Sequence, residues 1–243
     1  MTSFTRVDYR NLIKFISKDL NYSVGPLRNF PESGSAVILR HDIDFSVFKA
    51  LEMAEIELGL GVNSTYFVLL TCPFYNALEQ RNTDALKKIA RMGNEIGLHY
   101  DSSLLEGLSN EQINERIEKQ VSILESVTEC RIESISQHKP ATSKVRPKIT
   151  RYKDAYDDKY FKQIGYLSDS RKYFATEDVH SFFKKHKRSQ LLIHPIWWNS
   201  EDHSVQQIFE DLKSQINEAN ESEFDDFRRN IDEYFSKRLP LSY

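Results

Sequence analysis

The stretch Val37-Ile38-Leu39-Arg40-His41-Asp42-Ile43-Asp44, VILRHDID, begins as an apolar strand and ends in charged groups. Its branched aliphatic residues predict a buried strand over residues 35–43. A strand that only filled a core would not finish with a histidine and two carboxylates. We therefore expect a functional site at the carboxyl end of this strand.

Further strands are expected along the chain, and helical patterns separate them. The predicted strands are 64–70, a strand in NEIGLHY (94–100) that ends at His99, 132–137, 165–170 and 190–194. Helices are predicted over 9–20, 47–58 and 83–92, after Ser109, and along 205–216 and 224–234, the last two being polar. Ser46 is the expected N-cap of helix 47–58, and Gly59 is expected to end it. Ser109 and Gln112 are expected to form a capping box at the start of the fourth helix. Such alternation predicts an α/β fold with a mostly parallel sheet or barrel.

Polar side chains gather where these strands end. They are His41, Asp42, Asp44, His99, Asp101, His138, Asp169 and His194. Carboxyl ends of parallel strands share one edge, so these groups are expected to meet there. Imidazole and carboxylate are ligands for zinc and similar ions, and Asp42 and Asp44 could divide the tasks of base and ligand. The pattern predicts metal-assisted hydrolysis. The competing interpretation is structural: aspartates that cap helices and histidines that only form hydrogen bonds.

At these residues the sequence resembles the polysaccharide deacetylase superfamily, the NodB homology domain, and within it a branch found in surface polysaccharide biosynthesis. The matching segments are LRHDIDFSVFKALEMAEIELGLGVNSTYFVLL (39–70), FYN (74–76), GNEIGLHYD (93–101), SISQHKPA (134–141), YLSDS (166–170) and LLIHPIWW (191–198). The resemblance implies a distorted (β/α) barrel, here with additional N- and C-terminal helices, in a single domain 1–243 with a core of about 35–200. It also implies metal-dependent removal of an acetyl group from an N-acetylated sugar or sugar-linked precursor.

The resemblance also assigns roles to individual residues. Asp42 matches the catalytic base, and Asp44 the neighbouring metal ligand, displaced by Ile43. His194 matches the general acid, and Asp169 is the nearest match to a catalytic aspartate that orients the base arrangement. The metal is expected to be zinc.

The second motif departs from the family pattern. His99 matches the first of two metal-binding histidines spaced four residues apart, but Ser103 occupies the second position. A hydroxyl is a poor replacement for imidazole on zinc. His138 stands where the third motif usually has an arginine and could supply the missing nitrogen. His41 is the other candidate, although strand alternation places it on the face opposite Asp42.

Substrate contacts are expected from residues in or beside the same motifs. They are Arg40, His41, Tyr75, Asn76, Asp101, Trp197 and Trp198, the two indoles as faces for sugar rings or as core residues. The basic segment 139–153 follows His138 and is either a solvated loop or a binding site for an anionic substrate through Arg146 and Arg151.

Composition narrows the class of protein. A net charge of -3 argues against a dedicated nucleic-acid binder. The N-terminus lacks an apolar signal core, and no apolar run is long enough to insert into a membrane. The two cysteines, Cys72 and Cys130, have a spacing that fits no metal site. We therefore expect a cytoplasmic protein. Its partner is expected to be a carbohydrate or sugar-linked small molecule. The alternative function is a catalytically inactive deacetylase-like protein that binds a glycan or a biosynthetic partner.

Overall fold

The computed structural model describes residues 3–145, 147–176 and 178–238 of the 243-residue chain. Its contacts divide the chain into two compact units, Met1–Asp202 and His203–Tyr243. The first unit contains the whole sheet, and the second contains one long helix. The prediction of a single domain over the full length stays a prediction.

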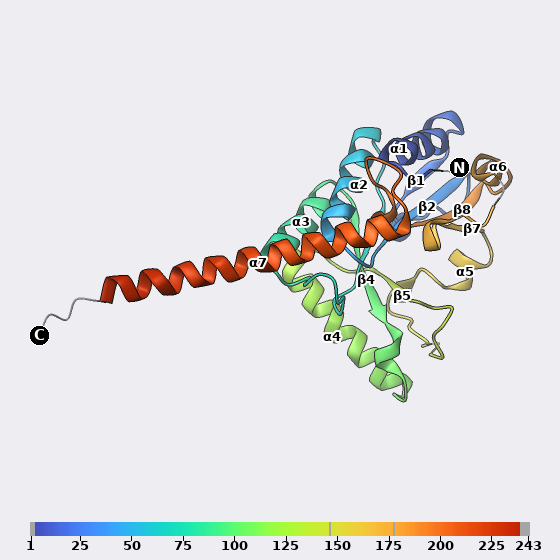
Figure 1. The fold of residues 1–243 in the computed structure, drawn as a ribbon. Coiled ribbons are helices and arrows are strands. Elements are labelled where there is room, and N and C mark those ends of the chain that lie inside the picture. The colour runs from blue at the N-terminus through green and yellow to red at the C-terminus, as the bar shows by residue number, and fades with distance from the viewer. Residues whose placement is uncertain (1–2, 146, 177, 239–243) are drawn as a thin grey trace, which may run out of the picture. The chain divides into compact units, whose positions relative to one another are not determined.

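An eight-stranded sheet forms the first unit and curls into a half-barrel surrounded by helices (Figure 1). The strands are β1 (Ser23–Gly25), β2 (Ala36–Ile43), β3 (Thr65–Val68), β4 (Glu95–Asp101), β5 (Ser134–His138), β6 (Lys153–Asp154), β7 (Gly165–Ser168) and β8 (Arg188–Ile193). Their order is β6-β5-β4-β3-β2-β8-β7, with β1 beside β2, and all the described pairings are parallel. The distorted barrel is thereby confirmed. The pattern missed the short strands β1 and β6.

Helices alternate with the strands along the chain, and α2, α3 and α4 pack against the outer face of the sheet. They are α1 (Arg6–Lys14, continued by a π-helical turn Phe15–Asp19), α2 (Val47–Leu60), α3 (Gln80–Arg91), α4 (Asn110–Thr128), α5 (Asp158–Phe161) and α6 (Val179–Lys185). The predicted caps of α2 and α4 are confirmed: Ser46 accepts the N–H of Lys49, and Ser109 forms a capping box with Gln112. The predicted end of α2 at Gly59 is wrong. The helix continues to Leu60, and Gly61 adopts the left-handed conformation (φ 68°) that ends it.

The second unit contains α7 (Val205–Arg238), one continuous helix of 34 residues. The prediction of two separate helices here is wrong. Residues 205–238 contain no glycine or proline, so nothing in the sequence interrupts the backbone hydrogen bonds. Within the described residues, no helix combines the length and hydropathy needed to cross a membrane.

Side chains fill the space inside the curled sheet. Ile38 and Phe67 are completely buried there, in one cluster with residues that precede β2 and follow β6. Gly97 on β4 allows this packing, because a Cβ at that position would lie 2.5 Å from the Phe67 ring and 2.9 Å from the Ser134 carbonyl oxygen. A second, larger cluster lies between the sheet and α2, α3 and α4. The polar strand ends therefore lie above a packed interior.

Candidate functional site

Alternation along β2 separates the polar residues of VILRHDID. Arg40 and Asp42 lie on the inner face of the sheet, and Asp44 follows two residues later. His41 lies on the opposite face, completely buried, with its Nε2 2.6 Å from Oε1 of Glu57 on α2. The structure therefore places His41 away from the other strand-end residues, in the layer between sheet and helix.

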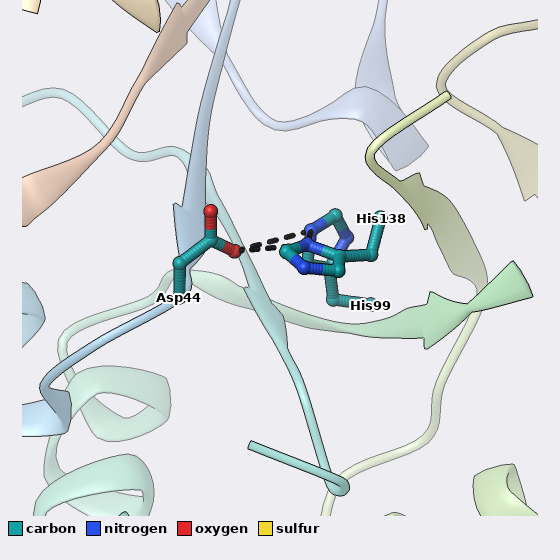
Figure 2. Close-up of side chains that lie close together, drawn as sticks. All are labelled: Asp44, His99 and His138. Atoms are coloured by element: carbon teal, nitrogen blue, oxygen red, sulfur yellow. Dashed lines mark hydrogen bonds and ion pairs between the residues drawn. The ribbon is translucent and has the colours of Figure 1, made fainter. Parts of the chain in front are cut away.

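Asp44, His99 and His138 converge from the ends of β2, β4 and β5 (Figure 2). Asp44 Oδ1 lies 3.3 Å from His99 Nε2 and 3.4 Å from His138 Nδ1, and the two imidazole nitrogens are 3.1 Å apart. All three donor atoms lie within 4.8 Å of one another. Three groups from separate segments thus direct one nitrogen or oxygen each at a single point.

The chemistry of these atoms fits a divalent cation. His99 Nδ1 lies 3.0 Å from the Ser136 carbonyl oxygen, which can only accept, so Nδ1 donates, and loss of the Nε2 proton on metal binding would turn the Nε2 lone pair toward the cluster. Asp44 Oδ1 is buried, and the atoms that face it are the imidazole nitrogens. Burial raises the pKa of the Asp44 carboxyl, but His138 and His99 outweigh it and hold that pKa well below its usual range. The cluster therefore offers one carboxylate and two imidazoles, a ligand set that zinc accepts.

Ser103 does not join this cluster. Its hydroxyl donates to Asp101 Oδ1 at 2.7 Å, and its backbone N–H donates to the same oxygen. The second imidazole of the cluster comes from His138, on the adjacent strand β5. The serine is thus a local turn residue at the end of β4.

Asp42 lies beside the cluster and is bound by a buried arginine. Arg40 Nη2 donates to Asp42 Oδ2 at 2.7 Å, while Asp42 Oδ1 is buried without a hydrogen-bond partner. Burial raises the pKa of Asp42, but the Arg40 guanidinium outweighs that effect and lowers it below the ordinary value. Asp42 is therefore held as a carboxylate, with one buried oxygen that accepts no hydrogen bond.

His194 is held by Asp169, which Trp198 holds in turn. His194 Nδ1 lies 2.6 Å from Asp169 Oδ1, and Trp198 Nε1 donates to Asp169 Oδ2 at 2.8 Å. The other ring nitrogen, His194 Nε2, lies 3.9 Å from Asp44 Oδ2. Burial lowers the pKa of His194, but the Asp169 carboxylate outweighs it, and the pKa rises to about 9. The imidazole therefore carries a proton near neutral pH and turns one N–H toward the cluster.

A cavity of about 820 Å³ opens above these groups. Asp42, Asp44, His99, His138 and His194 line it. Three aromatic residues of the segment between β5 and β8 also line it: Tyr156, Phe161 and Tyr166, whose rings meet edge to face with centroids 5.2 and 4.7 Å apart. The volume lies within the range of roughly 300–1,000 Å³ that small-molecule sites occupy.

The residues predicted to contact substrate do not line this cavity, and their contact with substrate stays a prediction. Arg40, His41, Tyr75, Asn76, Asp101, Trp197 and Trp198 are not among the described residues that line the cavity. Tyr75 donates to the carbonyl oxygen of Ile43 and so fixes the turn after β2. Trp198 is completely buried and packs against the rings of Phe4 and Tyr9.

Some features of the site were absent from the sequence prediction. The hydrogen bond from Arg40 to Asp42 could have been predicted, because residues two apart on a strand share a face. No periodic signal marks Tyr156, Phe161 and Tyr166, which lie in irregular segments and short elements. In the basic segment, Arg146 lies outside the described residues, and Arg151 pairs with Glu118 at 2.8 Å beside a different cavity. Among the described residues of that segment, Lys139 is the cation that lines the cavity.

Comparison with known proteins gives structural neighbours only. No family model and no curated protein matches the chain. Solved structures of carbohydrate esterase family 4 do match, the family of NodB-like deacetylases that the sequence motifs resemble. A family 4 pseudoenzyme from Bacillus anthracis aligns with a TM-score of 0.47 and 18% identity over 76% of this chain and 63% of its own, so the match spans less than two thirds of that protein. The family 4 domain of a xylanase from the hindgut metagenome of Trinervitermes trinervoides aligns with a TM-score of 0.49 and 15% identity. This match covers 79% of the present chain and 85% of the xylanase domain chain. The peptidoglycan deacetylase PdaC from Bacillus subtilis aligns with a TM-score of 0.43 and 16% identity, over 83% of the present chain and 99% of the PdaC chain.

Proposed function

We propose that this protein is a metal-dependent hydrolase that removes the acetyl group from an N-acetylated sugar or sugar-linked precursor. The observation that carries the proposal is the convergence of Asp44, His99 and His138 at one point beneath a cavity, with a carboxylate and a protonated imidazole beside them. Asp44, His99 and His138 would hold the ion, and zinc is the metal we expect from this ligand set. A divalent ion held there supplies Lewis-acid polarisation of the acetyl carbonyl and acidifies water.

Asp42 is the base in this proposal. Its free oxygen, Oδ1, takes a proton from the water that attacks the acetyl carbon. Arg40 keeps the carboxylate ionised and fixes its orientation through Oδ2. Arg40 is completely buried, so it acts through Asp42 rather than by touching substrate.

His194 is the acid. Asp169 fixes the ring so that Nε2–H faces the cluster, and that proton passes to the nitrogen of the leaving amine as the C–N bond breaks. Water adds to the acetyl carbon, and the products are acetate and a free amino sugar. The sequence resemblance further suggests a role in surface polysaccharide biosynthesis.

The first test is the metal content of the purified protein and of His138→Ala, measured by elemental analysis. We expect about one equivalent of zinc or a similar ion per chain in the wild type and its loss in the variant, because two ligands rarely retain such an ion. His180→Ala is the matched control, since His180 lies on α6 and pairs with Asp178. Unchanged metal in His138→Ala would remove His138 from the ligand set.

The catalytic part of the proposal has its own test. Acetate release from N-acetylated sugars should be present in the metal-loaded wild type and lost in Asp42→Asn, while metal content stays the same. Acetate release that survives in Asp42→Asn would contradict the assignment of the base.

A second function is favoured by one observation: the serine at position 103, which binds Asp101 instead of joining the cluster. On this alternative the protein is catalytically inactive and binds a glycan or a biosynthetic partner in the same cavity. This alternative predicts that the metal-free protein binds a sugar saturably and that Asp42→Asn leaves the affinity for the sugar unchanged.

A further inference from the structure

The mouth of the cavity carries positive charge, in contrast to its floor. The floor contains the carboxylates of Asp42 and Asp44, whereas Lys139, Lys162 and Arg171 line the cavity nearer the solvent. Lys162 is already paired, because its Nζ lies 2.8 Å from Asp158 Oδ1. Among the described residues, Lys139 and Arg171 form no ion pair, although the charge of Lys139 contributes to a lowered pKa of the Asp101 carboxyl. Two cations at the entrance are therefore available to a ligand.

The backbone fixes where these two cations lie. Lys139 directly follows His138, and its carbonyl oxygen accepts the N–H of Thr142 at 3.2 Å, which closes a turn at the cavity mouth. Arg171 comes two residues after Asp169, in a turn closed by the N–H of Lys172 at 2.9 Å from the Asp169 carbonyl. Each cation is thus carried on a hydrogen-bonded turn within two residues of His138 or Asp169.

Both residues also have left-handed backbone conformations, with φ of 48° at Lys139 and 62° at Arg171. Residues other than glycine, asparagine and aspartate adopt this conformation infrequently. The neighbouring Lys172 shares it, but its ammonium is paired with Asp202. Charge and pairing, rather than the backbone alone, distinguish Lys139 and Arg171.

We propose that the entrance of this cavity binds an anionic group on the substrate, a phosphate ester or a carboxylate of the sugar, through Lys139 and Arg171. Ammonium and guanidinium donors form charge-assisted hydrogen bonds with both kinds of anion. The carboxylates of the floor would repel the anion, so it binds at the mouth while the rest of the sugar extends inward beside Tyr156 and Phe161. The orientation of the acetamido group toward the floor rests on the proposed function; the anion contact does not.

The test measures sugar binding to the protein as purified, by isothermal titration calorimetry. Three probes separate the sources of charge: N-acetylglucosamine 1-phosphate, glucuronic acid and neutral N-acetylglucosamine. The test variant is Lys139→Gln/Arg171→Gln. The matched control is Lys144→Gln/Lys185→Gln, which makes the same change in net charge at exposed positions that do not line the cavity. Elemental analysis of each protein checks that metal content is equal.

We expect at least one anionic probe to bind about tenfold more tightly than the neutral sugar. The test variant should lose about that factor for this probe alone, the control should stay within about twofold, and added salt should reduce the difference. The probe that responds identifies the anion as phosphate or carboxylate. The charge-reversed pair Lys139→Glu/Arg171→Glu should weaken anion binding further.

Two results would overturn the inference: wild-type protein that binds neither anion better than the neutral sugar, or equal losses in the test and control variants. These results are distinguishable from failure of the proposed function. Protein without metal or acetate release that still binds anions through Lys139 and Arg171 would retain this inference and lose the hydrolase. Metal-loaded, active protein without a preference for anions would do the reverse.

Discussion

At the scale of single residues, the site contains buried charges of opposite sign that are paired with one another. Arg40 is completely buried, and its guanidinium contacts Asp42 at 2.7 Å, Ser136 at 2.9 Å and Gln190 at 3.1 Å. Its Cζ also lies over the ring of Tyr156, 4.7 Å from the centroid. A buried ion pair contributes little net stability, but removal of one partner leaves an uncompensated charge.

We predict that Arg40→Met lowers the free energy of unfolding by about 3–5 kcal/mol, measured in urea, because Asp42 loses its charge partner. The double variant Arg40→Met/Asp42→Asn should recover part of this loss, since no buried charge remains. The control is Arg151→Met, which removes an exposed ion pair with Glu118 and should cost at most about 1 kcal/mol. Equal losses for Arg40→Met and the double variant would show that the lost packing, not the charge, accounts for the cost.

Residue-level reasoning from the sequence located the strand-end groups but not all of their neighbours. Asp42, Asp44, His99, His138 and His194 line one cavity because parallel strands bring their carboxyl ends together. The three aromatic residues that line the cavity were not predicted, because Tyr156 and Phe161 lie outside the predicted elements and no pattern marks Tyr166 within the predicted strand 165–170. Lys139 belongs to the basic segment 139–153, for which an anionic ligand was one of two interpretations, whereas Arg171 was not singled out. Alternation alone placed His41 opposite Asp42, and the structure has it there.

At the scale of elements, a buried carboxylate joins β2 and β3 to α1 and α2. Glu57 of α2 is completely buried and accepts hydrogen bonds from Ser64 at 2.7 Å and Tyr66 at 3.0 Å, and from Tyr9 of α1. His41 of β2 contacts the same carboxylate. Helix and strand are thus positioned by polar contacts within an otherwise apolar layer.

We predict that Glu57→Ala lowers the free energy of unfolding by about 3–5 kcal/mol, because several buried donors lose their acceptor at once. Glu55→Ala is the matched control on the same helix: its pair with Lys88 is half exposed on both sides and should contribute at most about 1 kcal/mol. Chemical denaturation of both variants measures the difference. Similar small losses in the two would mean that the Glu57 contacts add nothing to the docking of α2.

Sequence patterns predicted elements where the pattern is strongly periodic or capped and failed where it is short. The capping box Ser109/Gln112 marked the start of α4, and apolar runs marked β2 and β3. The strand β6 has two residues, too few to show a period. The sequence analysis predicted two helices, 205–216 and 224–234, but residues 217–223 between them contain no glycine or proline, and α7 continues through them.

At the scale of the whole molecule, the stability of the first unit depends on pH through a carboxyl at the edge of the sheet. Asp154 of β6 is 9% exposed, and Tyr156 donates its N–H to Asp154 Oδ1 at 2.9 Å. Burial raises the pKa of Asp154 from 3.8 to about 6. Between these values the folded protein holds a proton that the unfolded chain has released, so stability falls as pH rises through this window.

We predict that Asp154→Asn removes this loss. A rise in pKa from 3.8 to about 6 corresponds to about 3 kcal/mol, so the variant should be more stable than the wild type above pH 6 by up to that amount and nearly equal below pH 4. Urea unfolding at intervals from pH 4 to pH 8 measures the two curves. Asp178→Asn is the control: hydrogen bonds from Ser181 and His180 lower the pKa of Asp178 to about 2, so its titration lies below the window and the slope should match the wild type. A constant offset between Asp154→Asn and wild type across the whole pH range would show that Asp154 is not the titrating group.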